Sequence, residues 1–177
     1  MRQCKIGTWA LSVLVAVGLL GACASSQINP PFYREYRDRY AITADELKRI
    51  QFYISGQVLA NPIDGSSQQV VIAFGTPGLA RDSGPDWVRV AFQEGAEGLL
   101  FRLRGPGAAA LYALATTIEG GRIALVSELP EPILTQGGRR YRVISGADVH
   151  LLVGNASVAR LIETRPRPLG LELKSDR

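Results

Sequence analysis

The chain has 177 residues, of which 46% are hydrophobic and 20% are charged, a balance typical of folded domains that excludes wholesale disorder. Its formal net charge is +4, but Arg2 and Lys5 precede the globular part, and the residues after position 22 carry 18 basic against 16 acidic side chains. Because the charges are so nearly balanced, there is no electrostatic basis for binding nucleic acid. The only cysteines are Cys4 and Cys23, which excludes a disulfide framework as well.

The N-terminal segment has the order of parts found in an export signal. Arg2 and Lys5 give it a positive start, and residues 6–24 carry no charge. The apolar stretch ends in small residues, where a signal peptidase cuts. The sequence therefore predicts a signal peptide over residues 1–22, ending in the tetrapeptide Leu20-Gly21-Ala22-Cys23.

This tetrapeptide resembles the lipobox of bacterial lipoproteins. The resemblance implies that Cys23 becomes the first residue of the mature protein, that its thiol carries a diacylglyceryl group and that the membrane is a partner through this anchor. Ala24 follows the cysteine, and by resemblance to lipoprotein sorting in enteric bacteria it implies a cell-envelope location at the outer membrane, facing the periplasm. Two other interpretations stay open: an uncleaved membrane-spanning anchor, because 19 uncharged residues approach the required length, and an ordinary secretion signal.

Residues 23–31 are predicted to be a lipidated tether, because they are small and polar and end in two prolines. Residues 32–50 are predicted to hold one or two short helices, the first with three tyrosines at helical spacing. These tyrosines either pack on the domain or lie with neighbouring arginines at lipid headgroups, where aromatic and cationic side chains settle. The candidate binding residues of this segment are Tyr33, Arg34, Tyr36 and Arg37, with Tyr40 on the same face.

The second helix has a clear start. Thr43 is followed three residues later by Glu46, the spacing of a capping box in which each residue binds the backbone of the other. Asp45 adds a negative charge near the positive end of the helix, which favours the same start. The sequence predicts a helix over residues 44–50.

Residues 51–164 are predicted to form a mainly β domain, a small barrel or sandwich. Short apolar runs alternate there with turns rich in glycine, proline, asparagine and aspartate. Gly137-Gly138 is predicted to close a two-residue hairpin, because both positions of such a turn need positive φ. The predicted strands are 51–60, 69–74, 87–92, 99–103, 109–116, 122–126, 141–144, 149–153 and 159–162, with a helix as the alternative at 108–113.

The stretch from Val70 to Phe101 resembles an SH3-like barrel and parts of uncharacterised exported lipoproteins, through its strands and the turn at 75–78. SH3-like domains often recognise peptides or wall material, but a fold alone assigns no activity. Strand alternation places Trp87 and Arg89 on one face. Both are candidate binding residues for peptidoglycan or lipid.

Residues 165–177 are predicted to be an extended C-terminal segment, because its two prolines restrict the backbone. Leu169, Leu171 and Leu173 then alternate with polar residues or glycine. Three interpretations stay open for this pattern: a last strand of the domain, a frayed tail, or a segment that adds to the sheet edge of a partner.

No catalytic, cofactor or metal site is predicted. His150 is the sole histidine, no Gly-x-Ser-x-Gly elbow accompanies it, and zinc sites need several histidine or cysteine ligands. Two carboxylate pairs, Glu94 with Glu97 and Glu128 with Glu131, leave a hydrolase as a remote alternative.

The sequence as a whole predicts a non-enzymatic envelope lipoprotein without cofactor or metal. Its expected partner is an envelope protein, which it would bind as an accessory subunit. A peptidoglycan-binding or lipid-binding module is the alternative, and a nucleic-acid partner is not expected.

Overall fold

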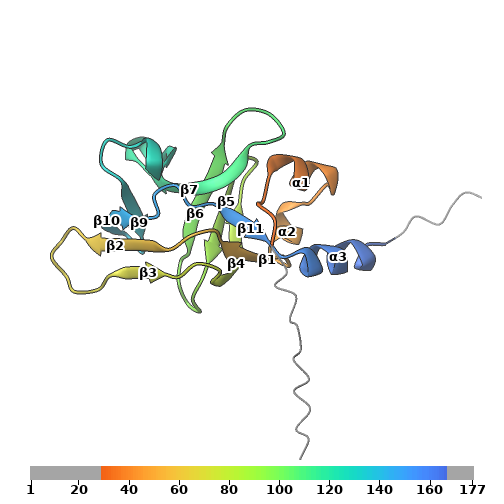
Figure 1. Cartoon of the computed structure of the whole chain (residues 1–177), viewed down its shortest axis with the longest axis horizontal. Coiled ribbons are helices and arrows are strands. Elements are labelled where there is room, and N and C mark those ends of the chain that lie inside the picture. The colour runs from red at the N-terminus through yellow and green to blue at the C-terminus, as the bar shows by residue number, and fades with distance from the viewer. Residues whose placement is uncertain (1–28, 167–177) are drawn as a thin grey trace, which may run out of the picture.

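The computed structural model describes residues 29–166. The predicted signal peptide, Cys23 with its predicted lipid and the leucine-containing tail 167–177 lie outside the described residues. Within this range the chain is mainly β, with two antiparallel sheets and three α-helices that gather at one end of the molecule (Figure 1). The predicted fold class is confirmed as a sandwich-like arrangement.

The larger sheet contains β1 (Gln51–Ile54), β4 (Pro77–Ser83), β5 (Trp87–Ala91), β6 (Leu99–Arg104), β7 (Leu111–Thr117), β8 (Ile123–Leu125) and β11 (Leu151–Val153). The smaller one contains β2 (Val58–Pro62), β3 (Val70–Ile72), β9 (Ile133–Gln136) and β10 (Arg139–Ser145). Their strand orders are β11-β1-β4-β5-β6-β7-β8 and β3-β2-β10-β9. Neither sheet closes on itself in the described chain, so of the two predicted forms the structure shows the sandwich and not the closed barrel.

One long bent hairpin joins the two sheets. Phe52 of β1 pairs with Gly78 of β4, and Ala60 of β2 pairs with Val70 of β3, so the same register runs through both pairs of strands. The prediction of a single strand over 51–60 is corrected here, because the chain bends between Ile54 and Val58 and passes from one sheet to the other.

Strand β4 is the largest departure from the predicted strands. Its first residues, Pro77 and Gly78, fall in the turn predicted at 75–78, and the rest of it, up to Ser83, lies outside the predicted strands. A proline is tolerated at the first position of a strand, where its missing N–H costs no ladder hydrogen bond. A register shift between Ala80 and Asp82 lets β4 continue to its end against β5.

Apart from 159–162, which lies in a helix, each of the other predicted strands overlaps an observed one. Strand β7 confirms the strand predicted over 109–116 and excludes its helical alternative. The hairpin of β9 and β10 is also confirmed: Gln136 pairs with Arg139, and the two residues between them, Gly137 and Gly138, have φ of 57° and 73°. Two 3-10 turns, Glu119–Gly121 and Val126–Glu128, flank β8.

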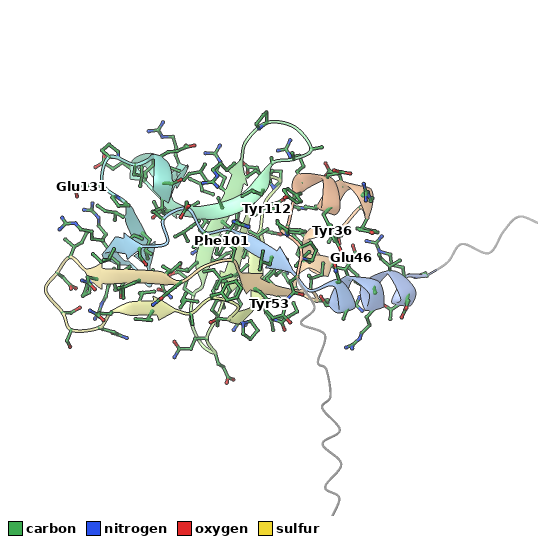
Figure 2. The ribbon with its side chains drawn as sticks, in the orientation of Figure 1. Tyr36, Glu46, Tyr53, Phe101, Tyr112 and Glu131 are labelled. Carbon is green, nitrogen blue, oxygen red and sulfur yellow. The ribbon has the colours of Figure 1, made fainter. Side chains whose placement is uncertain are left out.

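The core lies between the sheets and beneath the helices. Phe32 is fully buried and stacks on Tyr112, with the ring centroids 4.9 Å apart, while Phe52 meets it edge-on at 5.2 Å. Figure 2 shows Phe101 and Tyr112 in the interior, whereas Glu131 lies on the outside. The residues before Phe32 belong to this fold too, since the Val153 N–H donates to the Pro30 carbonyl at 2.9 Å.

The helices are α1 (Arg34–Arg39), α2 (Ala44–Leu47) and α3 (Asn155–Thr164). The predicted capping box is confirmed: the Thr43 N–H donates to Glu46 Oε2 at 2.9 Å, and Thr43 Oγ1 accepts from the Glu46 N–H at 3.3 Å. The predicted helix over 44–50 is shorter than expected and ends at Leu47. The strand predicted over 159–162 is wrong, because those residues belong to α3, whose buried Val158 and Leu161 are three residues apart, as helical packing requires.

Candidate binding cleft at the free edge of β3

A cleft of about 860 Å³ opens between β3 and the loop that joins β5 to β6. Four consecutive residues, from Val70 to Ala73, line it. Side chains of a strand alternate between its two faces, so four in a row can border one cleft only if the backbone edge of the strand faces it. The cleft therefore exposes the edge of β3 together with its side chains.

This edge of β3 has no strand partner in the described chain. Further along the same hairpin, β4 pairs with β1 on one side and with β5 on the other, but β3 pairs only with β2. If β5 continued in its register with β4, it would run beside β3. It ends at Ala91, and the chain turns through residues 92–98 before β6 begins. An unpaired strand edge presents N–H and C=O groups that a further strand can bind.

Gly98 allows the loop to pass close to the backbone of β5 before β6 begins. Its φ is +94°, a conformation that side chains disfavour, and a Cβ there would lie 2.7 Å from the backbone carbonyl carbon and oxygen of Val90. The loop consequently turns sharply into β6 and leaves the place beside β3 open.

The far wall of the cleft is fixed by Glu97. Its Oε1 accepts from Arg89 Nη1 at 2.9 Å, and its Oε2 accepts from the Gly137 N–H at 2.6 Å. These two contacts join the loop of the larger sheet to the β9–β10 turn of the smaller one. Arg89, a predicted binding residue, is therefore a positioning residue of the cleft wall, and both oxygens of Glu97 are engaged in protein contacts.

The lining suits a peptide-like ligand. Four glutamine side chains border the cleft, and the Oε1 of one of them, Gln136, is buried with no hydrogen-bond partner among residues 29–166. Apolar surface lines the same cleft: Val71, which is 57% exposed, borders it between these amides. Amides and apolar side chains along a free strand edge match the backbone and alternate side chains of an extended polypeptide. The four glutamines are Gln68, Gln69, Gln93 and Gln136.

The predicted binding residues of α1 lie at the other end of the molecule. Tyr36 packs on Phe32 and Tyr40, and its hydroxyl donates to Asn155 Oδ1 at 3.1 Å. Burial, with a smaller contribution from Tyr40, raises the pKa of the Tyr36 phenol. Tyr33 forms an isolated bridge with Leu111. The tyrosines thus pack on the domain, the first of the two interpretations of this segment.

The arginines of α1 differ from one another. Arg37 donates through Nη1 to the Gly84 carbonyl at 2.8 Å and to the Tyr112 hydroxyl at 3.0 Å. Burial raises the pKa of Tyr112 while the Arg37 cation opposes the rise. Arg34, three positions earlier, has an exposed side chain. The two residues therefore do not form one binding surface: Arg37 joins α1 to the larger sheet, and Arg34 faces solvent.

Trp87 lies on the face of the larger sheet that carries a second, smaller apolar cluster. It packs there against a group of residues that includes Leu100 and Ala113. Beside it Arg102 pairs with Asp86 at 3.3 Å and donates to the Ile123 carbonyl at 2.5 Å. Arg89 lies two positions further on the same face of β5, opposite Leu100, as the strand alternation predicts. Trp87 also lies close to α1, because its carbonyl accepts from the Gly84 N–H and the Gly84 carbonyl accepts from Arg37.

His150 has a serine neighbour that sequence reasoning did not identify. Ser55 Oγ lies 3.0 Å from His150 Nδ1 and also accepts the His150 backbone N–H at 2.8 Å. Burial, with a smaller effect from Arg104, lowers the pKa of His150. Neither residue borders the cleft, and the two hydrogen bonds join the β1–β2 bend to the residue before β11.

Between residues 29 and 166 no three or more histidine, cysteine, aspartate or glutamate side chains are grouped as metal ligands. In the same range no helix is long and apolar enough to cross a membrane. No family model, no curated protein and no solved structure matches the chain. Its own residues therefore carry the functional inference.

Proposed function

We propose that this protein is a lipid-anchored, non-catalytic domain of the bacterial envelope that binds an extended segment of a partner protein along the free edge of β3. The open edge beside the 860 Å³ cleft carries this proposal. The lipobox-like sequence ending at Cys23 supports the anchor and the envelope location.

Recognition would follow the mode in which a strand is added to a sheet. The partner's backbone would form hydrogen bonds with the unpaired edge of β3, and its alternate side chains would contact the cleft on one side and solvent on the other. The Oε1 of Gln136 is buried with no hydrogen-bond partner among residues 29–166, and it would serve as an acceptor if the side chain turned toward a bound strand. Val71 supplies exposed apolar surface at the same cleft.

The lipid anchor would assist this binding without contributing to its specificity. Two or three acyl chains hold a protein firmly to one leaflet, whereas a single chain holds it only marginally. Confinement to the envelope raises the effective concentration of the domain near its partner. A short edge strand of three residues can then be sufficient, because weak binding is reinforced by proximity.

The proposal is tested by blocking the edge. In Val71→Lys a charged side chain is placed on an edge strand, as natural proteins do to prevent strand addition. The full chain and this variant are crosslinked in their own membranes, and the captured proteins are identified by mass spectrometry. We expect a reproducible partner with the unmodified chain and at least a tenfold loss with Val71→Lys.

The matched control is Ile162→Lys on α3, because Ile162 is also a partly exposed apolar residue but lies away from the cleft. Capture should be unchanged in this variant. Equal capture by all three proteins, or no captured partner at all, would contradict binding at β3.

A further inference from the structure

We infer that the free edge of β3 in one copy of the chain binds residues 169–174 of a second copy; this inference rests on the proposed function and names the strand that the edge receives. The open strand edge and the segment that would add to it as a further strand then belong to the same protein.

The segment has the pattern of an added strand. Residues 169–174 read Leu-Gly-Leu-Glu-Leu-Lys, with an apolar side chain at every second position. In an extended chain the three leucines share one face, while Glu172 and Lys174 share the other. Prolines at 166 and 168 disfavour a continuation of α3 into this segment.

The cleft offers a matching pair of faces. Val70 and Ile72 of β3 point toward the core, together with Phe92 at the start of the loop, and they form its apolar side. Gln68 and Gln93 form part of its polar rim. If residues 169–174 lay beside β3, their three leucines would contact the apolar side of the cleft. Glu172 and Lys174 would stay in water, so burying the segment would not desolvate a charge.

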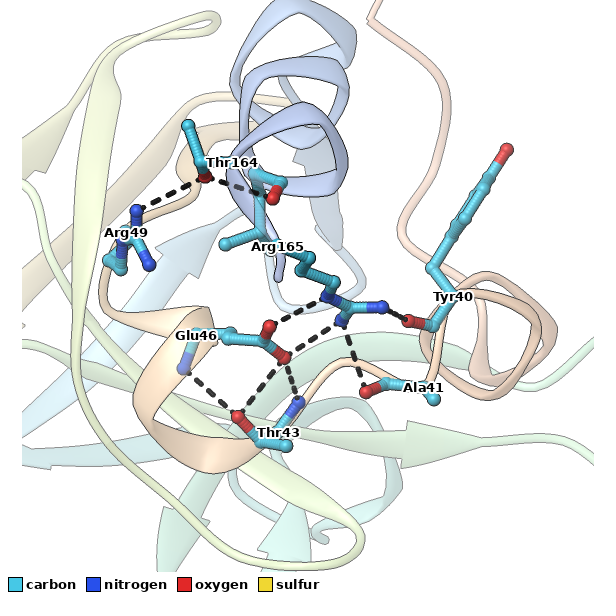
Figure 3. Close-up of polar contacts among 8 residues, drawn as sticks. Tyr40, Ala41, Thr43, Glu46, Arg49, Thr164 and Arg165 are labelled. Atoms are coloured by element: carbon cyan, nitrogen blue, oxygen red, sulfur yellow. Dashed lines mark hydrogen bonds and ion pairs between the residues drawn. The ribbon is translucent and has the colours of Figure 1, made fainter. Parts of the chain in front are cut away.

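The segment comes from a second copy because its own β3 is out of reach. Arg165 is held beside α2 by Glu46, as Figure 3 shows, and α3 and α2 lie at the opposite end of the molecule from β3 (Figure 1). The four steps from Arg165 to Leu169 span at most about 14 Å when fully extended. The β3 edge of one chain would therefore bind one neighbouring copy and its C-terminal segment would bind another, so that association is head-to-tail.

Photo-crosslinking of the full chain tests this directly. The residue p-benzoylphenylalanine replaces Val71, whose side chain is 57% exposed and tolerates the change, and membranes are illuminated. We expect a band at twice the monomer mass, with the crosslinked peptide derived from residues 167–177. The same photoreactive residue at Ile162 should give no such band.

Two loss variants then test the direction of association. The first, Val71→Lys, blocks the edge and keeps the segment; the second, Leu171→Lys with Leu173→Lys, alters the segment and keeps the edge. When two differently tagged copies of the same variant are present together, each variant should show at least a tenfold loss of co-purification of one tag with the other. Mixed, with different tags on the two chains, they should restore a mixed dimer, because the intact segment of the first can bind the intact edge of the second.

The outcomes separate this inference from the proposed function. A double-mass band that survives the leucine substitutions, or a mixture that restores no dimer, would overturn the self-association. Crosslinks from position 71 to a different protein would also overturn it, while supporting strand addition at β3. Absence of any crosslink from position 71 would overturn both.

Discussion

The guanidinium of Arg165 forms two hydrogen bonds with the carboxylate of Glu46, each 2.8 Å long, across 119 positions of the chain. The same guanidinium donates to the carbonyls of Tyr40 and Ala41, as Figure 3 shows, so one side chain joins the end of α3 to the segment between α1 and α2. Glu46 is at once a capping-box residue and the acceptor of this pair. The end of α3 and the start of α2 are consequently stabilised together.

Through Glu46, the free energy of unfolding of the domain depends on pH in the acidic range. Hydrogen bonds from Arg165 and then from Thr43 lower the pKa of Glu46 from 4.5 to about 2. A lowered carboxyl pKa contributes stability that is fully present above 4.5 and is lost as the pH falls from about 4.5 to about 2. We expect Glu46→Gln to lower the free energy of unfolding at pH 7 by about 1–2 kcal/mol, since solvent screens the partly exposed pair.

Urea denaturation at pH 7 and pH 3 measures this effect. The difference between the unmodified chain and Glu46→Gln should shrink at pH 3. Glu163→Gln, an exposed residue of α3, is the control and should change the unfolding free energy little at either pH. A difference that is as large at pH 3 as at pH 7 would assign another role to Glu46.

Arg37 is expected to matter for stability. Replacing it with methionine removes the donor to the buried Tyr112 hydroxyl and to two backbone carbonyls, and unsatisfied buried groups cost about 1–3 kcal/mol each. We expect Arg37→Met to lower the free energy of unfolding by about 2 kcal/mol. Arg34→Met changes an exposed neighbour and should stay within about 0.5 kcal/mol. Thermal and urea unfolding compare the two, and equal effects would show that the contacts of Arg37 contribute nothing specific.

Glu97 is expected to keep the β9–β10 turn in place. In Glu97→Ala the Gly137 N–H loses its acceptor, and Arg89 loses its partner. Hydrogen exchange by mass spectrometry should show at least tenfold faster exchange in the peptide that contains Gly137. Glu94→Ala removes a carboxylate of the same loop and should leave this exchange rate unchanged. If Glu94→Ala accelerates it as strongly, loop charge rather than the Glu97 contact fixes the turn.

Cys23→Ser tests the anchor. A serine cannot form the thioether, so the Cys23→Ser protein should be lost from the membrane fraction. Mass spectrometry of the chain without this substitution should show that it begins at Cys23 and carries acyl groups there. Cys4→Ser changes the other cysteine, which would be removed with the signal, and should leave both membrane association and final mass unaltered. A native product that retains Met1, or carries an unmodified Cys23, would contradict lipidation.

Local chemistry allowed some elements to be predicted and not others. The capping box at Thr43 and the turn at Gly137-Gly138 depend on residues a few positions apart, so the sequence displays them directly. Strand β4 was missed because Pro77 and Ser83 have turn-like composition, and only its neighbours β1 and β5 make it a strand. Helix α3 was missed because its apolar residues form a short run that fits either period.

The cleft could not be predicted because it results from relationships between distant segments. The free edge of β3 exists because β5 stops at Ala91 while β2 continues beside β3 for its full length. Glu97 was noticed as a possible catalytic carboxylate, but its partner Gly137 is 40 positions away and has no side chain to signal the contact. Likewise, nothing near Arg37 or Arg89 in the sequence indicates their partners. The carbonyls and the hydroxyl beside Arg37, and the carboxylate beside Arg89, are brought there by the fold.

The way in which the chain enters the domain determines how it would respond to tension. Residues 30–32 lie along β11 through hydrogen bonds from the Phe32 N–H to Leu151 and from the Val153 N–H to Pro30. A pull applied ahead of position 30 would first strain these few bonds, and beyond them it would have to extract the ring of Phe32 from its stack with Tyr112. Extraction of this buried ring would therefore be the step that resists unfolding of the sheet from its N-terminal end.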